Sequence, residues 1–184
     1  GPGGAPYRVG IWVRPNCSPF GIGDGESALQ LYRPTGATPA LARAGDPVRA
    51  ASGMTLLAND DAWGSDLAGE GRRVLAFDEV NGGNCAACSR LRLYVARADG
   101  LTELRVDAPP FVIPQAIETV AEGRRVLLGS DTRWEFFGGG CRACSPGVSV
   151  TFSWDGDHFA PACRAAADYF RRQAREASAR QDDT

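Results

Sequence analysis

Apolar and polar residues alternate with a period of two over much of this chain, which is the pattern of half-buried β-strands. The alternation is strongest at 7–13, 91–95 and 148–154. In the last stretch, Val148, Val150, Phe152 and Trp154 are expected to face inwards, and Ser149, Thr151 and Ser153 are expected to face solvent. Gly- and Pro-rich turns separate the alternating segments. The sequence therefore predicts a mainly β fold.

The period becomes helical after Pro161. We predict one amphipathic helix over 161–179 whose narrow, alanine-rich stripe packs on the β body. The stripe consists of Cys163, Ala166, Ala167, Phe170 and Ala174. Earlier in the chain, Asp46 and Pro47 suit the N-cap and first position of a short helix. Three prolines within 101–117 restrict any strand there to a short or edge position.

A six-residue string, Glu-Gly-Arg-Arg-Val-Leu, occurs at 70–75 and again at 122–127. Each copy leads into a glycine run, a Cys-x-x-Cys pair, an alternating strand and an Asp-Gly turn. Internal repetition at this spacing is typical of stacked or radial architectures. We therefore predict antiparallel repeat units at roughly 66–100 and 118–156, with a weaker copy at 7–36. They would form one domain over 6–160, either a partial propeller or a sandwich, and residues 1–5 read as a cloning scar or linker.

Composition excludes several classes of function. The net charge of −2 gives no overall field that favours nucleic acid or an anionic membrane. No stretch approaches the ~20 apolar residues of a membrane span. His158 is the only histidine, which excludes any multi-histidine metal site, and beside Phe159 it is expected to have a structural role and not a catalytic one. Neither a Gly-x-Ser-x-Gly elbow nor a P-loop occurs, and a non-enzymatic protein is expected.

The loop 66–72, Asp-Leu-Ala-Gly-Glu-Gly-Arg, with the strand 73–77 after it, resembles an FG-GAP or VCBS-like repeat of exported bacterial proteins. The segments 118–124 and 125–128 resemble a second, eroded copy. The resemblance implies four-stranded propeller blades whose acidic loops commonly hold calcium. Here each loop keeps only two carboxylates, Asp66 with Glu70 and Glu118 with Glu122. Calcium takes 6–8 oxygen ligands, so calcium binding is not expected.

The chain has an even number of cysteines, which suits a disulfide framework in an exported protein. They are Cys17, Cys85, Cys88, Cys141, Cys144 and Cys163. The simplest pairing joins Cys85 to Cys88, Cys141 to Cys144 and Cys17 to Cys163, and cross-pairing between the two motifs is equally allowed. The alternative is a zinc site formed by the four cysteines of the two Cys-x-x-Cys motifs. Thiol-redox chemistry is less compatible, because both motifs lead into strands instead of opening a helix.

These observations favour an exported, periplasmic or extracellular module that works by binding another protein or a cell-envelope component. The first residue is not methionine, as expected where a signal peptide or lipoprotein leader has been replaced. The expected contact surface combines the glycine–cysteine turns with an insertion in the second unit. Its candidate residues are Trp134, Phe136, Phe137 and Arg142. An inhibitor or immunity protein is one specific form of this binding function. Oligomerisation is compatible with it. The alternative function is that of a zinc-binding or thiol-redox protein that uses the two Cys-x-x-Cys motifs.

Overall fold

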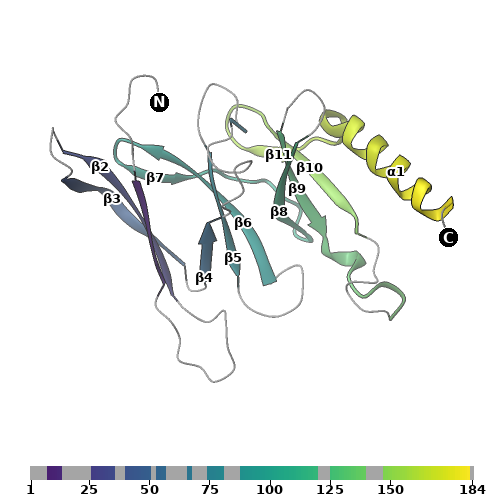
Figure 1. The fold of residues 1–184 in the computed structure, drawn as a ribbon, viewed down its shortest axis with the longest axis horizontal. Coiled ribbons are helices and arrows are strands. Elements are labelled where there is room, and N and C mark those ends of the chain that lie inside the picture. Colours follow the sequence, from purple (N-terminus) through teal and green to yellow (C-terminus); the bar gives the residue numbers. More distant parts are fainter. Residues whose placement is uncertain are drawn as a thin grey trace.

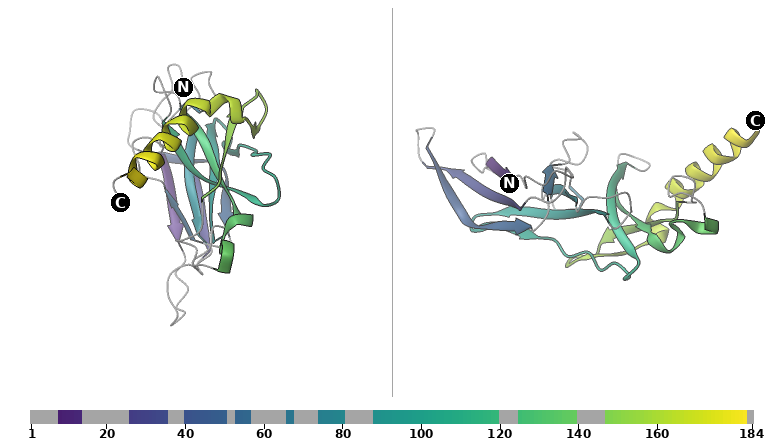
Figure 2. Two further views of the ribbon diagram at one scale, coloured as in Figure 1. Left: turned by 90° about the vertical axis from the view of Figure 1, so that its right-hand side faces the viewer. Right: turned by 90° about the horizontal axis from the view of Figure 1, so that it is seen from below.

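The computed structural model describes residues 8–13, 26–35, 40–50, 53–56, 66–67, 74–80, 88–119, 125–139 and 147–182. Within these ranges the chain forms three antiparallel sheets and one C-terminal helix, which confirms the predicted fold class. The sheets follow one another along the long axis of the molecule, and the helix lies at the far end (Figures 1 and 2).

Each sheet is a meander in which consecutive strands pair with one another. The first contains β1 (Arg8–Val13), β2 (Ser27–Pro34) and β3 (Leu41–Ala50). The middle sheet contains β4 (Gly53–Leu56), β5 (Val74–Val80), β6 (Ser89–Arg97) and β7 (Gly100–Glu103). The last contains β8 (Val112–Thr119), β9 (Arg125–Asp131), β10 (Ser149–Trp154) and β11 (Phe159–Pro161). β8 is an edge strand, as Pro114 within it predicts.

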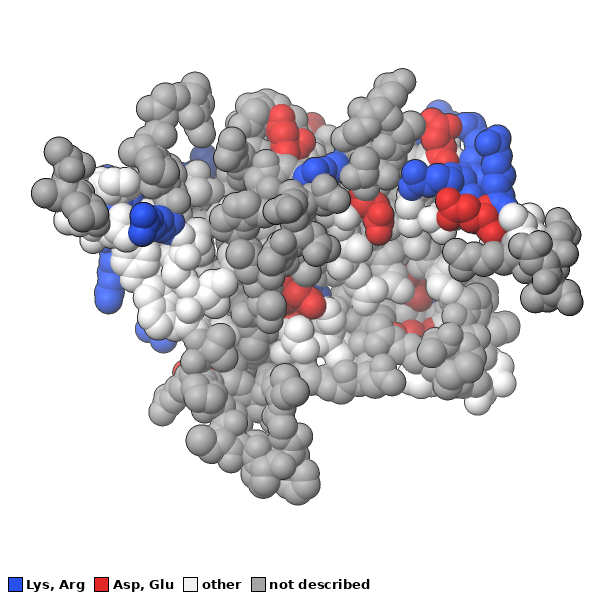
Figure 3. Space-filling view, in the orientation of Figure 1, with Lys and Arg blue, Asp and Glu red and all other residues white. Residues whose placement is uncertain are grey.

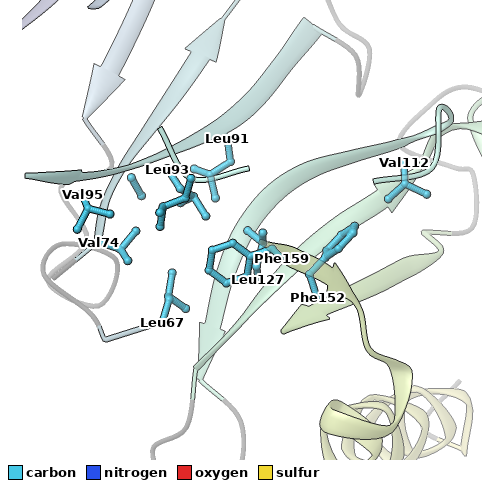
Figure 4. Close-up of a cluster of buried hydrophobic side chains, with 11 residues drawn as sticks. Leu67, Val74, Leu91, Leu93, Val95, Val112, Leu127, Phe152 and Phe159 are labelled. Carbon is cyan, nitrogen blue, oxygen red and sulfur yellow. The ribbon is translucent and has the colours of Figure 1, made fainter. Parts of the chain in front are cut away.

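The middle sheet is covered on both faces. One face packs against the last sheet, and Leu93, Leu127 and Phe152 lie at the centre of that shared core (Figure 4). The other face packs against the first sheet, where Phe77 and Tyr94 contact Leu29. Successive strand residues point to opposite faces, so β5 is buried over four consecutive residues, Val74–Phe77.

The outer face of the last sheet is covered by the C-terminal helical segment. This begins with a 3-10 turn, η6 (Cys163–Ala166), and continues as α1 (Ala167–Asp182). Ala166 and Tyr169 pack on Val126 and Leu128 of β9. This cover buries Thr151, which was expected to face solvent.

The helix packs over a shorter length than the sequence predicts. Pro161 ends β11 instead of beginning the helix. Residues 171–179 are all exposed, Ala174 among them, so only the first turns of α1 contact the sheet.

The middle and last sheets share one strand register. Tyr94 pairs with Leu75 on one side and Glu103 on the other, and Phe152 pairs in the same way with Leu127 and Pro161. Along the sequence, both Cys-x-x-Cys motifs fall between the second and third strands of their sheets. The following turn is longer in the last sheet, where Trp154 pairs with Phe159, than in the middle one, where Arg97 pairs with Gly100.

The predicted helix at Asp46 and Pro47 is wrong, because both residues lie in β3. β3 is an edge strand, and the missing N–H of Pro47 is tolerated there. A bulge opposite Gln30 admits extra residues, and the Gln30 amide donates to the carbonyl oxygens of Ala44 and Gly45 at 3.3 and 3.1 Å. Gly45 has φ +68°, so the chain turns there without helix formation.

Candidate binding site at residues 131–139

The segment 131–139, called the turn 131–139 below, begins at the last residue of β9 and contains the insertion that distinguishes the second repeat unit from the first. It includes two 3-10 segments, η3 (Thr132–Trp134) and η4 (Phe137–Gly139). Its first residue, Asp131, is 4% exposed and caps η3 by accepting a hydrogen bond from the backbone N–H of Arg133 at 3.1 Å. The Arg133 side chain closes on the same carboxylate, with Nη2 2.6 Å from Oδ2. These hydrogen bonds lower the pKa of Asp131 below its ordinary value.

Further bonds fasten the turn to the neighbouring strands. The backbone N–H and the hydroxyl of Thr132 both donate to the carbonyl oxygen of Phe111, at 2.8 and 2.9 Å. The Asp131 N–H donates to Val148 at 2.9 Å. The Arg133 guanidinium lies 3.6 Å from the centroid of the Phe111 ring, a cation–π contact. The base of the turn is therefore held to the residue before β8 and to the residue before β10.

The tip of the turn presents two aromatic side chains to solvent. Trp134 is 36% exposed and Phe136 is 52% exposed. Phe136 has φ +60°, in the left-handed region, and among the described residues no other non-glycine residue has a positive φ. That conformation costs about 1–2 kcal/mol for an L-residue, and Phe136 gains little burial in return. The predicted contact residues Trp134 and Phe136 are thus brought together on one turn.

Two other predicted contact residues are not placed. Of Phe137 only the backbone in η4 is described, and Arg142 lies outside the described residues. Sequence reasoning did not identify the residues that support the turn, Asp131 and Arg133. The available signal was an aspartate at the end of a strand followed by a polar pair, which is a cap arrangement.

The cysteines are described only in part. Cys88 directly precedes β6, is half-buried and is disulfide-bonded. Cys17, Cys85, Cys141 and Cys144 lie outside the described residues, and the side chain of Cys163 is not described. The pairing of the disulfides therefore stays a prediction.

The acidic loops of the predicted repeats are also mostly outside these ranges. Glu70 and Glu122 are not described, whereas Asp66 and Glu118 are exposed. In the part of the chain that the structure describes, no group of three or more His, Cys, Asp or Glu residues is arranged to hold a metal ion.

His158 lies in the turn between β10 and β11. Its Nδ1 is 3.3 Å from Asp155, and its Nε2 is 3.8 Å from Asp107. Asp155 accepts backbone hydrogen bonds from Asp157 and His158, at 3.0 and 2.9 Å, and the bond from His158 contributes most to lowering the pKa of the Asp155 carboxyl. These bonds shape the turn, which gives this acidic group a structural role.

Comparisons with family models, curated proteins and solved structures return no match to this chain. Among the described residues, no helix has the length and apolar character needed to cross a membrane. Basic and acidic side chains are mixed over α1 (Figure 3), so this end of the visible face carries no one-signed patch.

Proposed function

We propose that the protein is a non-enzymatic binding module that recognises another protein through the turn 131–139. The observation that carries this proposal is Phe136, an exposed aromatic residue in a strained backbone conformation. Backbone strain at an exposed position persists only where the surrounding structure enforces it, and such positions concentrate at functional sites. Hydrogen bonds of Asp131, Thr132 and Arg133 hold the start of the turn on which Phe136 lies.

The chemistry of the tip favours an apolar pocket on the partner. Aromatic residues, tryptophan above all, provide a large share of binding energy at protein interfaces. Hydrogen bonds hold the start of the turn that carries Trp134 and Phe136, so less backbone entropy is lost when a partner covers them. Arg133 is occupied by Asp131 and Phe111, which leaves the aromatic pair as the main contact.

The proposal includes export to an oxidising compartment, where a disulfide at Cys88 persists. A structural zinc site needs deprotonated thiols as ligands. A disulfide at Cys88 removes one of the four cysteines that such a site would use. The FG-GAP-like resemblance remains a hypothesis about ancestry and adds no ligand to this proposal.

The test replaces both aromatic residues and follows capture of partners. Immobilised protein is incubated with an envelope extract, and the proteins retained by wild type are compared with those retained by the double variant Trp134→Ser, Phe136→Gly. The control is Trp12→Ser, because Trp12 is 49% exposed and lies in the first sheet against Tyr32. We expect the double variant to lose specific partners that the control retains. Equal retention by both variants would refute the turn as the contact site.

A further inference from the structure

A groove of about 530 Å³ lies between the middle and last sheets and has one open strand edge as a wall. β7 pairs only with residues 94–97 of β6. The Leu104 N–H still donates to the Leu93 carbonyl oxygen at 2.8 Å, and the chain then leaves the middle sheet. Val106 instead bridges to Phe159 in the last sheet. Residues 89–92 of β6 therefore have no neighbouring strand on this side among the described residues.

The backbone of this open edge presents hydrogen-bonding groups to the groove. The Leu93 carbonyl points away from β5, and residues two apart in a strand present their N–H and C=O in the same direction. Leu91 therefore directs its backbone N–H and C=O into the groove. Its side chain is 2% exposed within the core, which holds that edge in place.

The opposite wall cannot pair in the same way. It is formed by the start of β8 and the segment before it. Pro114 has no N–H, and the N–H of Val112 is already bonded to Pro109 at 2.9 Å. Prolines on an edge strand protect it from pairing. A ligand strand in the groove would therefore hydrogen-bond to β6 and not to β8.

The side chains along the groove specify an alternating ligand. Arg90 is exposed, has no ion-pair partner among the described residues, and points to the same face as Arg92. Arg92 is already engaged by Glu103, with Nε 2.8 Å from Oε1. On the opposite face of β6, the partly buried groove residues Val106 and Ala108, which pack against the core cluster that contains Leu91, offer apolar surface. A strand beside β6 would place every second side chain near Arg90 and the others against this apolar surface.

We propose that the groove binds an extended peptide segment of a partner protein, which adds as a strand to residues 89–92 of β6 and alternates acidic with apolar side chains. Main-chain hydrogen bonds to Leu91 hold the segment, and the alternate side chains confer specificity. The open edge spans about 13 Å, four residues at about 3.3 Å each. The groove shares no lining residue with the turn 131–139, so this inference goes beyond the proposed function and is independent of it.

The probe is a capped hexapeptide of alternating glutamate and valine, titrated up to about 1 mM, a concentration that detects weak binding. The control peptide has the same composition with the glutamates in one block and the valines in another. Binding is followed by fluorescence anisotropy and by the amide NMR signal of Leu91. We expect the alternating peptide to shift that signal and the block peptide to bind at least tenfold more weakly.

Two further comparisons separate strand addition from attraction between charges. The peptide is methylated on alternate backbone nitrogens in two isomeric forms, and only one form should lose binding, by at least tenfold. On the protein, Arg90→Glu should weaken binding at least tenfold, whereas Arg97→Glu should not, because Arg97 is an exposed arginine of the same strand outside the groove. Circular dichroism verifies that both variants are folded.

The proposal is overturned if the folded protein does not bind the alternating peptide, or if the block peptide binds equally well. It is also overturned if both methylated isomers bind like the unmethylated peptide, or if Arg97→Glu weakens binding as much as Arg90→Glu does.

Discussion

The packing of the first sheet on the middle sheet depends on a backbone contact that the substitution Gly45→Ala would break. A Cβ atom at Gly45 would lie 2.0 Å from the carbonyl oxygen of Asp99 and 2.9 Å from the Cα of Gly100. Both neighbours are backbone atoms, so no side-chain rotation relieves the clash. The β6–β7 turn and the bulge of β3 would have to separate.

The magnitude has two parts. Gly45 has φ +68°, and an L-residue there costs about 1–2 kcal/mol. Forcing extra atoms into a packed contact costs about 1–3 kcal/mol more. The total, about 2–5 kcal/mol, is a large fraction of the 5–15 kcal/mol of a typical domain.

Gly138→Ala is the matched control, because Gly138 has φ +69° and no atom of the described residues lies within 4 Å of its added Cβ. Urea unfolding followed by tryptophan fluorescence gives both free energies of unfolding. We expect Gly45→Ala to lose about 1–3 kcal/mol more than Gly138→Ala, the part assigned to overpacking. Equal losses would show that the two sheets do not approach as closely as the structure places them.

Three further substitutions test the interior and the turn. Asp131→Asn removes the carboxylate whose pKa is lowered by the hydrogen bonds from Arg133. The stability that this carboxylate contributes should be present above the ordinary aspartate pKa of 3.8 and disappear as pH falls below it. The free energies of unfolding of wild type and variant should therefore converge in acid. Urea titrations between neutral and acidic pH would detect a constant gap, which would contradict this. Among the described residues the buried Tyr94 hydroxyl has no hydrogen-bond partner, so Tyr94→Phe should leave stability unchanged or raise it by about 1 kcal/mol in thermal unfolding, and a clear loss would reveal a partner. Leu127→Ala, in the core between two sheets, should cost about 2–5 kcal/mol, whereas Leu41→Ala, at an exposed site, should cost less than about 0.5 kcal/mol.

The alternating pattern predicts strands well but does not predict which faces are covered. Phe152 was expected to be buried and is. Thr151 was assigned to solvent and is buried, because a helical segment outside the strand, beginning at Cys163, covers that face. No periodicity within β10 carries information about that cover. The consecutive burial of β5 has the same origin, since two other sheets pack on it.

The helix-start preferences of Asp46 and Pro47 led to a wrong prediction of a short helix. Both suit the start of a helix, yet strand pairing with β2 determines the conformation of this segment. The contact role of Trp134 and Phe136 was proposed from composition and position alone. The hydrogen bonds between Arg133 and Asp131 at the start of the same turn were not predicted, because they follow from the turn geometry. The open edge of β6 arises where β7 ends, which no sequence pattern marks.

The double cover of the middle sheet also determines the order in which the molecule can come apart. The first sheet, or the last sheet with its helix, can in principle separate while the middle sheet keeps one packed face. The middle sheet cannot leave first, because its departure strips the inner faces of both neighbours at once. The free energy for opening β5 and β6 should therefore approach that of global unfolding, with the two ends of the molecule as its less stable units.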